Sequence, residues 1–382
     1  MSGQRVVVGF MPLLDCAPLV AAVECGFAAQ EGLDLRLVRE TSWASIRDRL
    51  IVGQFNAAHM LGPMTVASAL GVGHLRVPLI APMALGQGGN AITVSRSLRQ
   101  AMLECGAGAD LDARVQGRAL SRVIRARSAA GKEPLVLAMV YPFSCHNYEL
   151  RYWLAASGID PDSDVRLVVI PPPLLVDAMR GGQIDGFCVG EPWNSVAVAA
   201  GVGHIVTTGV AIWKQCPEKV LGLRREWAEA TPDTVAALVR AVVRAAQWCD
   251  DTRNATELAQ LLAGPRYVGV PADLLRPALA GQLLPGAGEP SQDAPDFLVF
   301  ARGCATYPWP AHAQWFYQQM LRWQQIAASP SDLAAVAATY RPDLYRQAVR
   351  ATGTPVPADE ARVEKFFDGG AFKLLHEIGA LG

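Results

Sequence analysis

The fold is decided near the start of the chain, in the stretch Val6–Arg39, VVVGFMPLLDCAPLVAAVECGFAAQEGLDLRLVR. Its pattern predicts a buried strand, a helix that ends near Gly26 and a second strand, at 6–11, 16–27 and 33–39. The alternation continues with a helix, a short strand and another helix, at 43–53, 56–61 and 62–73. A repeated strand–helix order predicts a parallel sheet covered by helices.

A second unit with the same rhythm begins after Ser95. Its strands and helices alternate to about residue 209, and the rest of the chain is mostly helical, with an irregular interval rich in Gly and Pro near 264–312. A single lobe does not easily absorb so long a helical tail. We therefore expect an α/β protein of two lobes, with residues 1–92 and 213–382 forming lobe 1 and a helical C-terminal extension, and residues 93–212 forming lobe 2.

Composition restricts the classes of function. The 382 residues are 51% hydrophobic and 18% charged, and 34 Lys and Arg against 35 Asp and Glu give a net charge of −1. A balanced charge without basic runs argues against direct nucleic-acid binding and against a membrane-binding basic patch. The chain enters a strand soon after Met1, without a charged and apolar leader, which favours a cytoplasmic protein. Eight scattered cysteines without a CxxC pair favour reduced thiols and no metal site.

Four loops occupy the positions where doubly wound sheets bind ligands, beyond the carboxyl ends of strands. They are ETSWASIRD (40–48), GQGGNAIT (86–93), YPFSCHNYE (141–149) and CVGEPWN (188–194). Thr41 or Ser42 is suited to cap the helix of the first loop, and Ser144 or Asn147 that of the third. Helix N-termini offer free N–H groups and partial positive charge, which indicates a small anionic ligand.

Each candidate residue also has a structural interpretation. Trp43 is either a core aromatic or a wall of the ligand site, and His146 either a structural histidine or a ligand contact. Adjacent side chains diverge on a helix, so Cys145 and His146 do not form a nucleophile–base pair. Glu191 is suited to cap its own helix. Lys219 is either a solvated charge or a residue of the cleft between the lobes.

Seven motifs carry a resemblance that runs from about residue 5 to beyond residue 350. They are MPLLDCAPLVAA, TSWASIRDRL, AAHMLGPM, GGNAITVS, HNYELRYWLAASGIDP, VVIPPPLLVDAMRGGQIDGFCVGEPWN and IWKQCPEKVLG. Together they resemble the nitrate- and bicarbonate-binding solute receptors of ABC transporters. Within that family the chain most resembles the cytoplasmic nitrate/nitrite sensor of nitrate-assimilation antitermination systems. The resemblance implies a type II periplasmic-binding-protein fold, in which two lobes close like a clamshell.

The resemblance also implies the ligand-binding residues. The family's contacts come from the tryptophan of the SW helix start, an amide at the GGNAI strand start, the histidine before YELRYW and the lysine of PEK. In this chain they correspond to Trp43, Asn90, His146 and Lys219, with Gly190 and Glu191 beside the pocket. Asn90 stands where transporter relatives have glutamine, so its shorter amide must lie closer to the ligand or act through water.

The residues favour nitrate or nitrite over bicarbonate. Nitrate only accepts hydrogen bonds, which suits the ammonium of Lys219 and the donors of His146, Asn90 and Trp43. Bicarbonate receptors tend to have an acidic residue and a metal ion where this chain has Lys219. The sequence lacks haem, iron–sulfur and dinucleotide motifs, so we expect no cofactor and no enzymatic activity.

Without a chemical reaction, we expect the protein to act by changing its conformation when the anion binds. In the sensor family, the resemblance implies that the ligand-free protein holds an ANTAR-type antiterminator and releases it when nitrate or nitrite binds. The first alternative is a periplasmic receptor of a nitrate or bicarbonate ABC transporter. The second is an enzyme on this fold, like thiamine-pyrimidine synthases, whose cysteine-rich motif this chain lacks.

Overall fold

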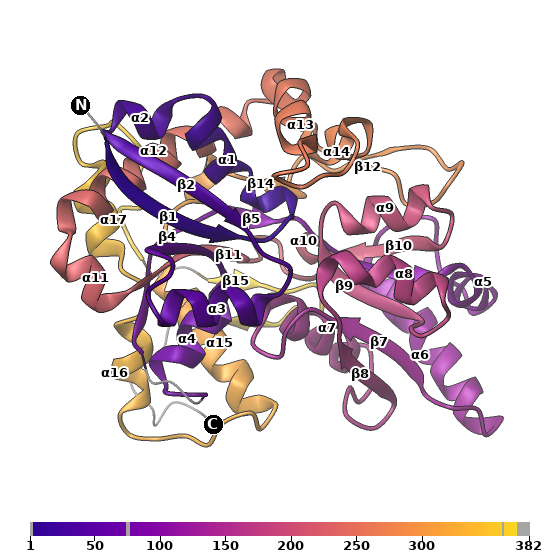
Figure 1. The fold of residues 1–382 in the computed structure, drawn as a ribbon. Helices are drawn as coiled ribbons and strands as arrows, with labels where there is room; N and C mark the ends of the chain where they lie inside the picture. Colours follow the sequence, from indigo (N-terminus) through magenta and orange to yellow (C-terminus); the bar gives the residue numbers. More distant parts are fainter. Residues whose placement is uncertain (1–2, 74–76, 361–362, 373–382) are drawn as a thin grey trace.

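The computed structural model describes residues 3–73, 77–360 and 363–372, which form two α/β lobes (Figure 1). The sheet of lobe 1 has the strand order β2-β1-β3-β11-β4, with β1 (Gln4–Phe10), β2 (Leu33–Arg39), β3 (Ala57–Leu61), β4 (Leu79–Ala84) and β11 (Lys219–Arg224). The sheet of lobe 2 has the order β10-β6-β9-β7-β8, with β6 (Asn90–Ser95), β7 (Leu135–Met139), β8 (Val165–Val169), β9 (Gly186–Gly190) and β10 (Gly203–Thr208). The two-lobed α/β class is confirmed.

Both sheets are mixed, so the expectation of a parallel sheet is wrong for part of each. β1 pairs in parallel with β2 and β3, and β7 with β8 and β9. In contrast, β11 runs antiparallel to β3 and β4, and β6 runs antiparallel to β9 and β10. The exceptions, β6 and β11, are the strands that follow a change of lobe, because each enters its sheet from the other lobe and not through a covering helix.

The helices of the lobes follow the predicted alternation. Those of lobe 1 are η1 (Leu14–Cys16), α1 (Ala17–Glu24), α2 (Phe27–Gln30), α3 (Trp43–Ile51) and α4 (Gly62–Ala69). Those of lobe 2 are α5 (Arg96–Glu104), α6 (Ala113–Ala129), α7 (Cys145–Ala156), η2 (Pro172–Leu174), α8 (Leu175–Arg180), α9 (Trp193–Ala199) and α10 (Gly209–Ile212). Within the described ranges, none of the helices is both long and apolar enough to cross a membrane.

The chain changes lobes twice. It leaves the first sheet after β4 and joins the second at β6, and it returns between β10 and β11. The predicted boundary after residue 92 falls inside β6, and the one after residue 212 falls between α10 and β11. A short strand, β5 (Gln87–Gly88), lies in the first crossover. Gly88 has a φ of 74°, and a Cβ there would lie 2.2 Å from the carbonyl oxygen of Phe297, so this crossover requires glycine.

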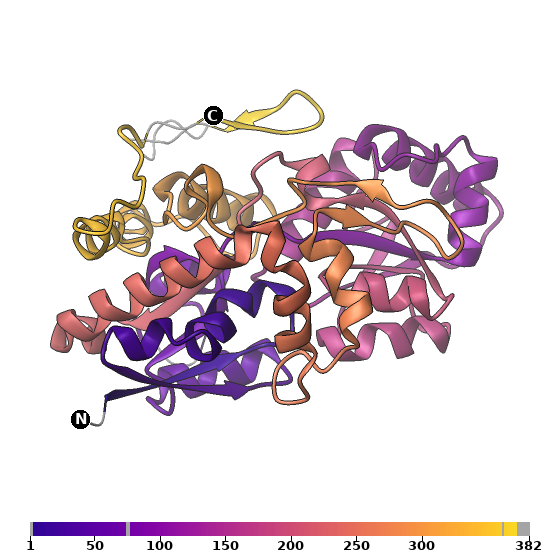
Figure 2. The same cartoon turned by 90° about the horizontal axis from the view of Figure 1, so that it is seen from above.

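Residues after β11 form what we call the C-terminal extension. Its helices are α11 (Arg225–Ala230), α12 (Pro232–Asp250), η3 (Thr252–Asn254), α13 (Ala255–Ala263), α14 (Ala272–Leu279), η4 (Arg302–Cys304), α15 (Pro310–Arg322), α16 (Asp332–Ala337) and α17 (Pro342–Val349). Its strands are β12 (Gln282–Leu283), β13 (Gln292–Asp293), β14 (Leu298–Val299), β15 (Glu364–Lys365) and β16 (Ala371–Phe372). Seen from above, α12 runs along lobe 1 beside α1 (Figure 2).

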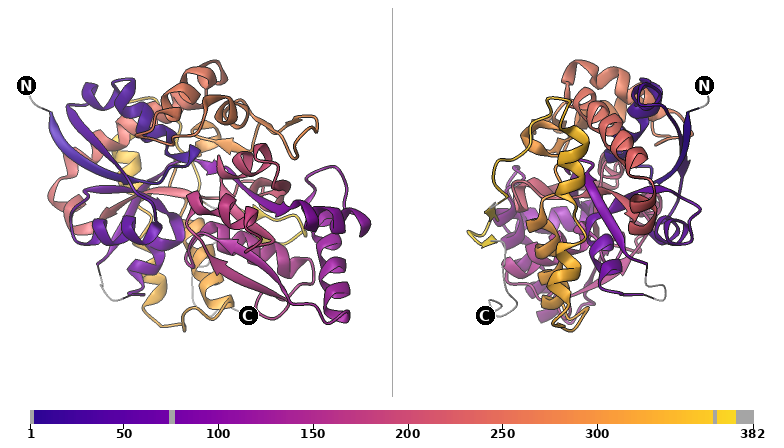
Figure 3. Two further views of the ribbon diagram at one scale, coloured as in Figure 1. Left: turned by 45° about the vertical axis from the view of Figure 1, so that its right-hand side comes forward. Right: turned by 90° about the vertical axis from the view of Figure 1, so that its left-hand side faces the viewer.

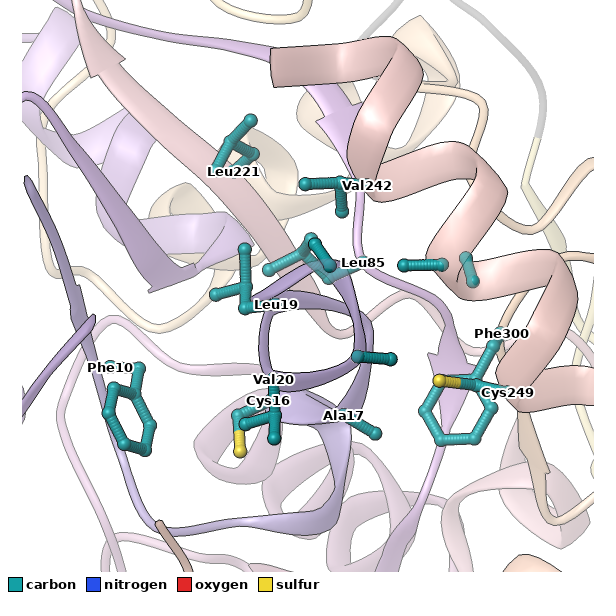
Figure 4. Close-up of a cluster of buried hydrophobic side chains, with 14 of the residues drawn as sticks. Phe10, Cys16, Ala17, Leu19, Val20, Leu85, Leu221, Val242, Cys249 and Phe300 are labelled. Carbon is teal, nitrogen blue, oxygen red and sulfur yellow. The ribbon is translucent and has the colours of Figure 1, made fainter. Parts of the chain in front are cut away.

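The core between α1 and α12 explains why the extension packs on lobe 1. Leu19 and Val20 of α1 belong to the same hydrophobic cluster as Val242 and Cys249 of α12 (Figure 4), and all four are almost fully buried. Both helices carry apolar residues at helical spacing, so each needs a partner surface. Cys249 acts here as a small hydrophobe, as expected for a buried free thiol.

The irregular interval near 264–312 reaches both lobes. Its strand β14 pairs antiparallel with β5 in the crossover. Between β12 and β13, the carbonyl oxygen of Pro285 accepts a hydrogen bond from the Ile205 amide of β10, and Glu289 Oε1 lies 2.9 Å from His204 Nε2. The interval therefore links lobe 1 and its extension to the outer strand of lobe 2 (Figures 1 and 2).

A second link joins the extension to the return crossover, the segment between β10 and β11. The hairpin β15–β16 places Phe366 in a cluster of aromatic rings with Trp213 of the return crossover, Trp315 of α15 and Tyr152 of α7. Trp213 Nε1 also donates a 2.7 Å hydrogen bond to Glu364 Oε2. This cluster joins the extension, the return crossover and lobe 2. The hairpin β15–β16 lies at the left edge of the molecule in Figure 3, right.

Candidate functional site

The structure gathers the predicted ligand residues into one cluster between the lobes. Trp43 begins α3, Asn90 begins β6, His146 lies in the first turn of α7 and Lys219 begins β11. Trp43 and Lys219 belong to lobe 1, and Asn90 and His146 belong to lobe 2. None of the four is more than 1% exposed, so the interpretation of Lys219 as a solvated charge is excluded.

Lys219 carries the positive charge around which the cluster is arranged. Its Nζ is 2.9 Å from Asp15 Oδ2 and 2.7 Å from Glu218 Oε2, and it stands 5.4 Å from the centroid of the Trp43 ring. Burial alone would lower the pKa of Lys219, but the two carboxylates raise it above its usual value, so the ammonium stays charged. Burial acts to raise the pKa of Asp15, yet Lys219 and His59 outweigh it and hold that pKa well below its usual range.

His146 is set by the start of α7. The hydroxyl of Ser144 accepts a 3.0 Å hydrogen bond from the Asn147 amide, which confirms Ser144 as the helix cap. His146 Nε2 lies 3.3 Å from Glu218 Oε1, and neither buried ring nitrogen forms a hydrogen bond with another described residue. Burial, and then the charge of Lys219, keep the pKa of His146 well below its usual value, so the imidazole is neutral. A neutral imidazole has one N–H to donate.

Trp43 is positioned in the same way by α3. The hydroxyl of Ser42 accepts a 3.2 Å hydrogen bond from the Ser45 amide, so Ser42 is the cap. The indole packs against His59, with 5.5 Å between ring centroids. His59 in turn lies 2.9 Å from Asp15, through Nε2 and Oδ1. Trp43 Nε1 is buried and has no hydrogen-bond partner within the described part of the chain, which leaves a donor aimed inside the protein.

Asn90 and Gly190 are partners in the sheet of lobe 2. They face each other across β6 and β9, and a Cβ at residue 190 would lie 3.4 Å from Asn90 Oδ1 and 3.6 Å from Asp15 Oδ2. Asn90 Nδ2 donates a 3.1 Å hydrogen bond to Glu149 Oε2. Gly190 therefore lies directly beside the amide of Asn90 and the carboxylate of Asp15, without a side chain between them.

Glu191 serves the framework of the site. Its carboxylate accepts a 3.2 Å hydrogen bond from the Ser195 amide in α9, which fits the interpretation of Glu191 as a cap. Its backbone carbonyl accepts from the Leu14 amide, and its amide donates to the carbonyl oxygen of Gly89. Burial raises the pKa of Glu191 to about 7. The residue thus ties the end of β9 to the first crossover and to the loop after β1.

Sequence reasoning missed four residues of the cluster: Asp15, His59, Glu149 and Glu218. All four are buried. Two had a local signal, because Glu218 adjoins Lys219 and Glu149 lies one helical turn after His146. Asp15 and His59 join the cluster only through the tertiary structure, which brings Asp15 to Lys219 and His59 to Asp15.

Neither a nucleophile nor a metal site accompanies these residues. Cys145 Sγ contacts the carbonyl oxygen of Glu218 at 3.5 Å, and burial raises the pKa of the Cys145 thiol well above its usual value. A thiol held neutral in this way is a poor nucleophile. Over the described ranges, no group of three or more His, Cys, Asp or Glu has a geometry that could hold a metal ion.

The lobes also meet at a second contact near the starts of α3 and α7. Arg47 of α3 donates a 2.5 Å hydrogen bond through Nη1 to the hydroxyl of Tyr141, which precedes α7. Both residues line a cavity of about 420 Å³ together with Met64 and Phe143. This contact joins one lobe to the other outside the buried cluster.

Comparisons with known proteins find relatives along most of the chain. The chain matches the model of the NMT1-like family over residues 2–263. It is 35% identical over 378 residues to the nitrate/nitrite binding protein NrtA of Synechococcus elongatus, covering 96% of this chain and 83% of that protein. It is 36% identical to the nitrate import ATP-binding protein NrtC of Synechocystis sp., but spans only 54% of that protein's length.

A solved structure shows the same fold. The crystal structure of the periplasmic nitrate-binding protein NrtA from Synechocystis superposes with a TM-score of 0.89 at 31% identity, over 97% of this chain and 96% of that one. The expected periplasmic-binding-protein fold is thus confirmed.

Proposed function

Because this chain belongs to the NMT1-like family and its relatives include nitrate/nitrite binding proteins, we propose that it binds nitrate or nitrite between its lobes. The observation that carries the proposal is the buried cluster of Trp43, Asn90, His146 and Lys219, in which residues of both lobes surround one ammonium group. A ligand held by both lobes stabilises the closed arrangement, since it contacts each lobe only when they meet.

Two donors of the cluster suit an ion that only accepts hydrogen bonds. The ammonium of Lys219 and the indole N–H of Trp43 are donors without any acceptor capacity. Nitrate and nitrite match such a set. Bicarbonate carries a hydroxyl that needs an acceptor. The proposed output is a change of conformation and not a chemical step.

The role best supported by the relatives is that of a solute receptor for an ABC transporter, which delivers the bound anion to a permease. Isothermal titration calorimetry tests the ligand. We expect nitrate and nitrite to bind with micromolar dissociation constants, which is about −8 kcal/mol. Bicarbonate is expected to bind at least about 100-fold more weakly, a difference of roughly 2.7 kcal/mol. Tighter binding of bicarbonate than of nitrate would contradict the proposed specificity.

We also propose a second role, that of a cytoplasmic sensor which holds an ANTAR-type antiterminator and releases it when the anion binds. One observation favours this role: the five buried cysteines, Cys16, Cys145, Cys188, Cys216 and Cys249, are free thiols, as is usual in a reducing compartment. In this role the protein acts through its partner, without contacting nucleic acid or membrane.

Co-purification with the regulator encoded by a neighbouring gene tests the sensor role. We expect a complex without nitrate that dissociates when nitrate is added. The Lys219→Ala variant, tested in parallel, should keep the complex at nitrate concentrations that dissociate the wild-type one. Failure to form a complex, or a complex unaffected by nitrate, would leave the transport role alone.

A further inference from the structure

The positive charge of Lys219 is already outweighed by carboxylates before an anion arrives. Its ammonium contacts two carboxylates, those of Asp15 and Glu218. Among the described residues, no other lysine or arginine lies within ion-pair distance of either carboxylate. Two carboxylates against one ammonium give a net charge of −1, and a bound anion would make it −2. In a buried site with little screening, the added like charge is unfavourable.

A third carboxyl group lies next to this centre. Glu149 Oε2 accepts the hydrogen bond of Asn90, and Glu149 Oε1 is buried without a hydrogen-bond partner in the described chain. Burial, and then repulsion by Glu218, raise the pKa of Glu149 to about 8. Glu149 is therefore mostly protonated at neutral pH, and it repels an anion only when it loses that proton.

Glu218 is the carboxylate whose protonation would change the donors of the site. Burial raises its pKa, and Asp15 adds to the effect, although Lys219 opposes it. When Glu218 is ionised, we assign the N–H of the neutral His146 to Nε2, because Glu218 Oε1 lies 3.3 Å from that atom. When Glu218 is protonated, its hydroxyl donates to Nε2 and the imidazole N–H moves to Nδ1. Protonation thus turns Nδ1 from an acceptor into a donor, which an anion requires.

We propose that the site takes up about one proton from solvent with each anion that it binds, and that Glu218 and Glu149 hold the proton. The inference rests on the proposed anion binding. The two carboxyl groups are faced by other ionisable side chains from every surrounding element: Asp15, Cys145, His146, Cys188, Cys216, Lys219 and Tyr340. Burial raises the pKa of the three thiols and of the Tyr340 hydroxyl, so these four groups stay neutral near pH 7.

The sign of the pH dependence follows from linkage. A bound anion raises the pKa of the nearby carboxyl groups. Nitrate therefore binds most tightly at low pH, where these groups are protonated, and its affinity falls as the pH rises. Glu149 loses its proton from the free protein around pH 8, which steepens the loss there. Affinity for nitrate is expected to fall by up to about tenfold per pH unit above neutrality, which corresponds to one proton per anion.

Calorimetry of the wild-type protein tests the proposal without any variant. Nitrate is titrated at about pH 8 in buffers with different ionisation enthalpies, and the slope of the observed enthalpy gives the number of protons taken up. We expect a value close to one. Nitrate binding without proton uptake would overturn the proton linkage and leave the proposed function intact. An absence of nitrate binding at every pH would overturn both.

Isosteric variants then test the assignment. Glu218→Gln and Glu149→Gln remove one ionisable group each, and Glu104→Gln on the exposed face of α5 is the matched control. Each buried variant is expected to reduce the proton uptake and to flatten the pH dependence, and the double variant to abolish both. The control should behave as wild type. Wild-type proton uptake in the double variant would overturn the roles given to these residues.

Discussion

The Lys219→Ala variant is expected to unfold with a free energy about 3–5 kcal/mol below that of wild type, because breaking a buried ion pair leaves charges without compensation. Asp15 and Glu218 both lose their contact with the ammonium, and both are almost fully buried. Nitrate binding is expected to weaken roughly 10- to 150-fold, since a charge-assisted hydrogen bond to an anion contributes about 1.5–3 kcal/mol. Urea unfolding measures the first effect and calorimetry the second.

Lys214→Ala is the matched control, because Lys214 lies five residues away and is exposed. It should leave both quantities close to wild type. The stability lost in Lys219→Ala should diminish as the pH is lowered, since Asp15 and Glu218 then gain protons and no longer need a cation. A variant with wild-type affinity for nitrate would show that Lys219 does not contact the anion.

The second large effect is expected from Trp213→Ala, in the return crossover. The side chain is 1% exposed and its ring centroid lies 4.5 Å from that of Trp315 and 5.1 Å from that of Phe366. Replacing so large a buried aromatic residue by alanine typically costs about 3–5 kcal/mol. The loss of the hydrogen bond to Glu364 adds to this cost. Thermal and urea unfolding should show the destabilisation directly.

Two further variants separate the contributions at this position. Trp213→Phe keeps an aromatic ring but lacks the indole N–H, so its cost should be clearly smaller than that of alanine. Trp227→Ala, on α11 and only partly buried, is the control for removing a tryptophan elsewhere. Equal destabilisation by Trp213→Ala and Trp227→Ala would show that the aromatic cluster does not stabilise the protein more than a partly buried tryptophan elsewhere does.

The four ligand residues were predicted through the resemblance to a family, and only two of them also had a local signal. Trp43 and His146 lie at predicted helix starts, and Ser42 and Ser144 do cap these helices. The strand and helix alternation likewise depends on residues close in the chain, and the predicted α7 begins at Cys145 as expected. Local hydrogen bonds and periodicity decide such features, so a single sequence contains them.

The electrostatic character of the site could not be predicted in the same way. Asp15 meets Lys219 across about 200 residues of sequence, because β11 returns from lobe 2 and enters the first sheet between β3 and β4. Its antiparallel direction, which the strand–helix rhythm did not indicate, places Lys219 beside Leu61 at the end of β3. Lys219, for which a solvated charge was one interpretation, therefore has its ammonium paired with two carboxylates in the structure.

The links from the C-terminal extension have a mechanical consequence. β14 is paired with the first crossover, the Pro285–Glu289 segment is bonded to β10, and Phe366 is packed on the second crossover. A rotation of one lobe against the other must shift or strain these three attachments. If the proposed anion rotates the lobes when it binds, the same rotation therefore rearranges the packing of the C-terminal extension.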